Sequence, residues 1–299
     1  MMRRVSIALG IVIATITIFA LALPSDATKE ILALRGHFGT GEAIATQRDE
    51  QSVIREVALR SERGEVLTNA WIRRPVALKA NYRVVMTYAG ANTGDAILQL
   101  IPARDDLVVV AVQYPWKPPH TFLSRVSAIY DIRQAAYRTV AGGIVAVDFI
   151  TRNEHLDPHR IILLGASLGS IFATIHGAID QRVQQVVLIH GGADLAGTLG
   201  AEIRRVPKWL RWPLVSLARI PIATFDPAQY VSRIAPRHLL MIAARDDWRF
   251  PPEAIVAFFN VAREPKELRW TKTVHVGARN RRVVETVIAE LNAYLDAAR

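Results

Sequence analysis

The chain of 299 residues contains no cysteine, which excludes a disulfide scaffold, a thiolate metal site and a cysteine nucleophile. It also lacks an HExxH sequence, so we expect no metal and no cofactor. A G-x-G-x-x-G turn is missing too, which disfavours a nucleotide-dependent enzyme. The hydrophobic share of 51% is ordinary for a globular protein, and no repeat or low-complexity tract is present.

Acidic residues are fewer than basic ones, 27 against 37, and the formal net charge is +10. Such an excess fits an anionic surface or an acidic ligand. The basic residues are spread along the chain without an aromatic–basic recognition motif, so we expect no nucleic-acid partner.

The first residues, 1–23, have the pattern of a targeting or anchoring segment. Arg3 and Arg4 precede Val5–Leu23, a run without a charged side chain. The length of this run lies between that of a signal peptide and that of a spanning helix, and Ala20–Ala22 offers a small-residue cleavage site. A cleaved export signal and an uncleaved membrane anchor both remain open. Either one predicts an exported protein, periplasmic or otherwise extracytoplasmic.

The rest of the chain has the pattern of an α/β domain over residues 51–299. Residues 24–50 are expected to be a lead-in, helical around Thr28–Leu34 and then a loop. Alternating residues in Ser52–Arg60 and Glu65–Ile72 predict a hairpin. Short apolar runs, typical of strands buried on both faces, then alternate with helical stretches. The runs are 82–88, 107–112, 161–164, 186–189 and 238–243, and the helical stretches are 124–151, 167–179, 252–262 and 280–297. Residues of about 191–236 break the alternation and predict a helical cap insertion.

The segment with the most specific chemistry is the G-x-S-x-G sequence from Gly165 to Gly169, between a predicted strand and a predicted helix. A strand that turns into a helix at one residue forces that residue to positive φ, and its neighbours must be very small. Ser167 would then project its hydroxyl at the carboxyl edge of the sheet, beside the positive end of a helix. We therefore predict that Ser167 is a nucleophile.

A serine nucleophile needs a base, and the base needs an orienting acid. At turns of this kind the acid and the histidine follow the serine in chain order. Asp247 follows the predicted strand 238–243 and is our candidate acid, with Asp246 as the fallback. His275 is the only histidine after that acid, so it is the candidate base.

The oxyanion of the tetrahedral intermediate needs two N–H donors. One is expected from the amide of Leu168, directly after the nucleophile. The other is expected from the loop after the strand 82–88, namely from Ala91 with Gly90 as its neighbour, because small residues let the backbone approach a substrate.

These features, with the segments 156–160 and 226–236, resemble the α/β-hydrolase superfamily over Gln51–Arg299. More narrowly, the chain is similar to the esterase and prolyl-oligopeptidase-like serine hydrolases. The resemblance implies a mostly parallel eight-stranded sheet flanked by helices, a Ser–Asp–His triad and an acyl-enzyme. Two features depart from the family: the loop after 82–88 reads Tyr-Ala-Gly-Ala instead of His-Gly-x, and no glycine precedes His275.

The insertion carries Trp209 and Trp212 among basic residues. This composition suits contact with a membrane surface or a lid over an acyl pocket, and it also suits a cap helix with a solvated basic face and tryptophan in its core. Our leading hypothesis is a serine hydrolase that cleaves a carboxylic ester of a small-molecule acyl substrate. The alternatives are a peptidase or amidase of the same fold and an inert hydrolase-fold protein that binds at the membrane surface.

Overall fold

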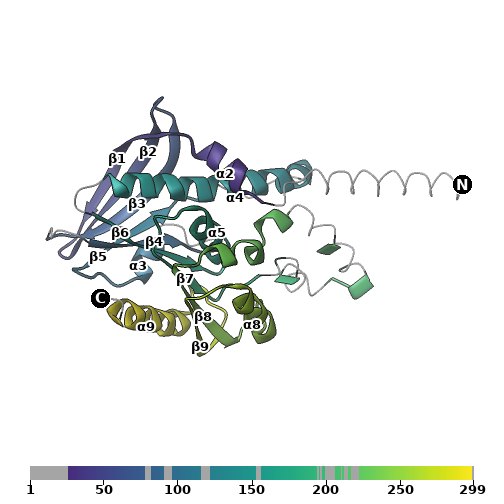
Figure 1. The fold of residues 1–299 in the computed structure, drawn as a ribbon. Helices are drawn as coiled ribbons and strands as arrows, with labels where there is room; N and C mark the ends of the chain where they lie inside the picture. The colour runs from purple at the N-terminus through teal and green to yellow at the C-terminus, as the bar shows by residue number, and fades with distance from the viewer. Residues whose placement is uncertain are drawn as a thin grey trace, which may run out of the picture.

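Figure 1 shows the computed structural model of the protein. It describes residues 26–77, 82–90, 96–115, 122–152, 156–193, 195, 197–198, 206–209, 211, 215–216 and 222–297, with the backbone alone for 122–130 and 157–159. The predicted targeting segment 1–23 lies outside these residues. No helix within the described ranges is long and apolar enough to cross a membrane.

The described residues form strands and helices in alternation after an initial antiparallel unit. The strands are β1 (Phe38–Arg48), β2 (Ser52–Ser61), β3 (Val66–Pro75), β4 (Tyr82–Tyr88), β5 (Leu107–Val112), β6 (Leu156–Ala166), β7 (Gln185–Ile189), β8 (His238–Asp246) and β9 (Lys266–Val274). The helices are α2 (Thr28–Arg35), α3 (Ile97–Leu100), α4 (Phe122–Thr151), α5 (Leu168–Ile179), α8 (Pro252–Val261) and α9 (Arg281–Ala297), with short 3₁₀ turns η2 (Ala223–Phe225), η3 (Pro227–Gln229) and η4 (Val231–Arg233).

All these strands belong to one sheet, in the order β1-β2-β3-β5-β4-β6-β7-β8-β9. The pairs β1–β2, β2–β3 and β3–β5 are antiparallel, and every pair from β5 to β9 is parallel. The parallel strands come from the continuous apolar runs, because a strand covered on both faces has no polar side. The predicted α/β fold with a mostly parallel sheet is confirmed, as is the hairpin, which forms β2 and β3.

The sheet has nine strands in the described residues rather than eight, because the lead-in contributes β1. We expected a loop after the helix in 24–50, and the structure places an edge strand there. Almost every residue of β1 is exposed, so the strand is stabilised by its backbone pairing with β2 and carries little hydrophobic pattern. Glycine is required at position 41, since a Cβ on Gly41 would lie 2.6 Å from the Phe149 ring of α4.

Helices cover both faces of the sheet, as Figure 1 shows. Side chains of α2, α4, α5 and α8 pack with one set of strand residues, and those of α3 and α9 pack with the other set. The two sets alternate along a strand: Val84 and Met86 of β4 face the first layer, while Val85 faces the second. The result is a three-layer architecture whose parallel strands all end at the same edge.

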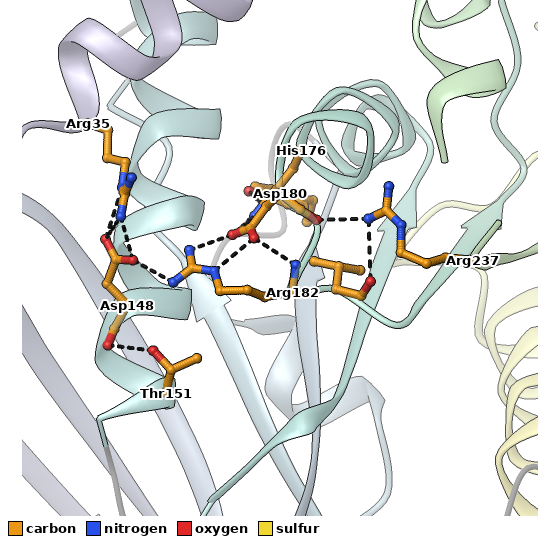
Figure 2. A network of polar contacts seen from close by, with 9 residues as sticks. Arg35, Asp148, Thr151, His176, Asp180, Arg182 and Arg237 are labelled. Atoms are coloured by element: carbon orange, nitrogen blue, oxygen red, sulfur yellow. Dashed lines mark hydrogen bonds and ion pairs between the residues drawn. The ribbon is translucent and has the colours of Figure 1, made fainter. Parts of the chain in front are cut away.

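A partly buried polar network ties α2 to the first helical layer (Figure 2). Arg35, the last residue of α2, forms a two-pronged ion pair with Asp148 of α4, whose Oδ1 lies 2.7 Å from Arg182. Arg182 also binds the carboxylate of Asp180, and Arg237 donates to the Asp180 carbonyl at 2.8 Å. The network therefore links α2, α4, the end of α5 and the segment before β8.

The predicted cap insertion of about 191–236 is described in part. Its last portion, 222–236, consists of η2, η3, η4 and their connections. Trp209 is described and is 78% exposed. Trp212 lies outside the described residues.

Candidate active site

The strand-to-helix turn at Ser167 has the geometry that the G-x-S-x-G sequence predicts. β6 ends at Ala166, α5 begins at Leu168, and Ser167 between them has φ 53° and ψ −117°. Its N–H donates to the Ile189 carbonyl of β7 at 2.9 Å, which holds the turn against the sheet. Positive φ is costly for a serine, and such strain persists only where the surroundings enforce it.

The two glycines of the motif are required by close packing around this turn. A Cβ on Gly169 would lie 2.0 Å from the Tyr88 carbonyl oxygen, and one on Gly165 would lie 2.6 Å from the Gly169 carbonyl oxygen. Backbone atoms cannot move aside as a side chain can. The first turn of α5 therefore packs directly on the end of β4, which brings the loop after β4 close to Ser167.

Three of the predicted site residues form a continuous hydrogen-bonded chain. Ser167 Oγ lies 2.8 Å from His275 Nε2, and His275 Nδ1 lies 2.7 Å from Asp247 Oδ2. Ser167 follows β6, Asp247 follows β8 and His275 follows β9. Because parallel strands end at a common edge, residues that are far apart in sequence meet there.

The Asp247 carboxylate is oriented by the backbone of the turn that it begins. Oδ1 accepts hydrogen bonds from the N–H groups of Arg249, at 2.8 Å, and Phe250, at 3.2 Å, which leaves Oδ2 for His275. Burial by itself would raise the pKa of Asp247, but the hydrogen bond and charge of His275 and the two amides hold it below its ordinary value. Asp247 is therefore a carboxylate at neutral pH.

Asp246, the fallback acid, is exposed at the end of β8, whereas Asp247 is buried. The structure thus places Asp247 against His275.

The predicted oxyanion donors are described in part. Leu168 is the first residue of α5, so its amide is among those that a helix leaves without an intrahelical acceptor. Gly90 lies in the loop after β4, next to Ala89, whose carbonyl accepts a hydrogen bond from the Tyr114 hydroxyl at 2.6 Å. Ala91 lies outside the described residues.

A residue that we did not predict, His190, lies behind the Asp247–His275 pair. It follows β7, has φ 46° and is 0% exposed. Its ring centre is 6.1 Å from that of His275, and desolvation by burial lowers the pKa of His190 to about 4. His190 precedes the acid in the chain, so the Ser–acid–His order does not predict it. The sequence feature that indicates this position is the stretch His190-Gly191-Gly192, which directly follows a buried strand and therefore lies at the same sheet edge.

Within the described part of the chain, one group of side chains could hold a metal ion: His190, Asp247 and His275. Each offers one ligand atom, and these atoms all lie within 4.8 Å of one another.

Comparison with solved structures identifies similar folds. An acetyl xylan esterase from a Paenibacillus species is 18% identical with a TM-score of 0.63, covering 88% of this chain and 92% of that one. An acetyl xylan esterase from a Thermoanaerobacterium species is 14% identical with a TM-score of 0.62, covering 88% and 90%. A cold-adapted esterase from an Arctic intertidal metagenomic library is 14% identical with a TM-score of 0.59, covering 85% and 99%. At identities this low, the similarity shows only that the fold is shared.

The comparison with curated proteins finds no match to this sequence. A family model described as the alpha/beta hydrolase fold matches residues 85–261, which run from β4 to the end of α8 and include Ser167 and Asp247. This match spans more than half of the chain and agrees with the sheet order and the turn at Ser167. The protein therefore belongs to the α/β-hydrolase fold family.

Proposed function

We propose that the protein is a serine hydrolase that cleaves carboxylic esters. The observation that carries this proposal is the hydrogen-bonded chain Ser167–His275–Asp247 at a turn where the serine is held at positive φ. The similar solved structures support an ester as the substrate, since each of these three proteins is named an esterase.

In the proposed reaction, Ser167 Oγ attacks the ester carbonyl while His275 Nε2 takes the hydroxyl proton. Asp247 accepts the Nδ1–H of His275, which keeps the tautomer with a free Nε2 lone pair and stabilises the imidazolium. The amide of Leu168 and a second amide, from Gly90 or Ala91, bind the oxyanion. The alcohol leaves with the proton from His275, and the acyl group stays on Ser167. Water then attacks the acyl-enzyme, with His275 as its base.

The test of this proposal is the Ser167→Ala variant. Loss of the nucleophile in a triad enzyme costs about a million-fold in turnover. We expect the wild type to hydrolyse p-nitrophenyl esters and to react with a fluorophosphonate probe, and the variant to do neither. Ser232→Ala, in η4, is the matched control and should keep both properties. Probe labelling that persists in Ser167→Ala would overturn the assignment, and a wild type that neither labels nor turns over would favour an inert binding protein.

Ester and amide cleavage are separated by the choice of substrate. The same triad serves both reactions, so we would compare p-nitrophenyl esters of increasing acyl length with the matching p-nitroanilides. Faster turnover of the anilides would replace the esterase proposal by a peptidase or amidase.

We also propose that residues 5–23 direct export and that Trp209 and Trp212 contact a membrane surface. The high exposure of Trp209, next to Lys208 in the sequence, supports the second proposal. Intact mass of the exported protein will show whether residues 1–23 are removed, and a protein found only in the cytoplasm contradicts export. Co-sedimentation with anionic liposomes should fall when both tryptophans become alanine; unchanged binding contradicts the membrane contact.

A further inference from the structure

His190 has a nitrogen that the proposed reaction does not use. Its backbone N–H donates to the Ile242 carbonyl at 2.8 Å, and its ring Nε2 lies 3.5 Å from the Thr271 hydroxyl. Nδ1 is buried and has no hydrogen-bond partner among the described residues. A buried imidazole nitrogen without a partner is unfavourable, so its position beside Asp247 and His275 requires an explanation.

The three side chains present a ligand set that suits a borderline divalent metal. Two imidazoles and one carboxylate are a common set for Zn²⁺, with a fourth position open. Two of the ligands have an outer partner that orients them. Asp247 Oδ1 is held by two backbone amides, which leaves Oδ2, and the Nε2 of His190 faces Thr271, which leaves Nδ1.

The geometry of the group requires little movement to bind such an ion. Zinc bonds of 2.0–2.2 Å in a tetrahedron place ligand atoms about 3.4 Å apart. One ligand atom from each side chain lies within 4.8 Å of the other two, so movements of about 1 Å bring them to this spacing, and Asp247 Oδ2 and His275 Nδ1, now 2.7 Å apart, must separate. Ser167, which is hydrogen-bonded to His275, is partly exposed, so an ion would approach from the side of the serine.

We propose that His190, Asp247 and His275 form an inhibitory binding site for Zn²⁺ within the active site. An ion between Asp247 Oδ2 and His275 Nδ1 replaces the hydrogen bond that joins them. The proton of Nδ1 moves to Nε2, because a neutral imidazole that binds a metal through one nitrogen carries its proton on the other. Nε2 then donates to Ser167 Oγ and no longer accepts its proton, so the serine is not activated. The inhibition rests on the proposed hydrolase function, whereas metal binding does not.

Metal binding is tested first in the Ser167→Ala variant, in which no acyl chemistry takes place. Titration with Co²⁺ should give the visible absorption of a tetrahedral site, and calorimetry should give one Zn²⁺ site. A second substitution in the Ser167→Ala variant, either His190→Asn or Asp247→Asn, should weaken metal binding by at least about tenfold. Adding His37→Asn, at an exposed histidine directly before β1, should leave binding unchanged. Equal affinity in all four proteins, or no binding in Ser167→Ala, overturns the site.

Inhibition is tested separately in the active protein. Zn²⁺ should inhibit hydrolysis of p-nitrophenyl acetate by the wild type, with recovery on adding EDTA, and the inhibition constant should rise at least about tenfold in His190→Asn. An unchanged constant in a folded His190→Asn protein overturns the inhibitory role. If the wild type hydrolyses no ester, the proposed function fails while the cobalt spectrum still decides whether the metal site exists.

Discussion

Two neighbouring aspartates, Asp246 and Asp247, have the same charge and very different surroundings. Asp247 is buried, receives two backbone amides and binds His275, while Asp246 is exposed. Asp247→Asn should reduce kcat about 10⁴-fold, because an amide that donates to Nδ1 holds the wrong tautomer of His275. Asp246→Asn should change kcat by less than about threefold, since it removes an exposed charge. Steady-state kinetics on one ester decide this, and a similar loss in both variants would contradict the role of Asp247.

His190 should make the stability of the protein depend on pH. Burial holds the folded-state pKa at about 4, below the ordinary value of about 6.5, so between these pH values the unfolded chain binds the proton more readily. The contribution of neutral His190 to the free energy of unfolding, up to about 3 kcal/mol, is present in full above pH 6.5. This contribution is lost as the pH falls toward 4. Urea unfolding from pH 7 to pH 4 should show a flatter loss in His190→Asn than in the wild type or His37→Asn. Parallel curves for all three would count against a neutral His190.

At the scale of single elements, the approach of α5 to β4 depends on Gly169. A Cβ there meets the Tyr88 backbone at 2.0 Å, so Gly169→Ala must push α5 away from the sheet. We expect a loss of about 3 kcal/mol or more in the free energy of unfolding, together with loss of activity. Gly277→Ala is the control, because a Cβ at Gly277 has nothing within 4 Å. Thermal melts of both variants test the argument, and equal melting temperatures would refute it.

The loop after β4 is held from two sides by tyrosines. The Tyr114 hydroxyl binds the Ala89 carbonyl at 2.6 Å, and the Tyr88 hydroxyl lies 2.7 Å from His176 Nδ1 of α5. Gly143 of α4 leaves room for this contact, since a Cβ there would lie 1.7 Å from the Tyr88 hydroxyl. The backbone beside Ser167 is thus positioned by the packing of α4 and α5 as well as by its own sequence.

At the scale of the whole molecule, Asp148 joins parts of the chain that are distant in sequence. It lies between Arg35 of α2 and Arg182, before β7, as Figure 2 shows. Asp148→Asn should destabilise the protein by about 2 kcal/mol, less than a fully buried ion pair would, because both arginines are about one third exposed. Glu42→Gln, which breaks the exposed pair with Arg60, should cost less than about 1 kcal/mol. Urea unfolding of both variants gives the comparison, and equal costs would contradict it.

Much of the fold and of the candidate site could be predicted from the sequence, for local reasons. Continuous apolar runs indicated the parallel strands because burial on both faces leaves no polar side. The glycines around Ser167 indicated the turn because positive φ and close backbone contacts are properties of a few adjacent residues. Chain order then predicted that an aspartate after β8 and His275 would meet the serine, and the structure brings them together.

Other features required the tertiary structure, because they depend on contacts between distant segments. β1 is an exposed edge strand whose stability comes from pairing with β2, so its side chains showed little pattern. The sequence favoured Asp247 but kept Asp246 as a fallback, because burial and contact with His275, which distinguish the two, depend on the tertiary structure. His190 was missed for the same reason: its place behind the Asp247–His275 pair results from the alignment of β7, β8 and β9. Local sequence patterns thus predict most strands and helices and the turn at Ser167, because these depend on neighbouring residues, whereas β1 and the set of side chains that meet at the sheet edge depend on how distant segments pack.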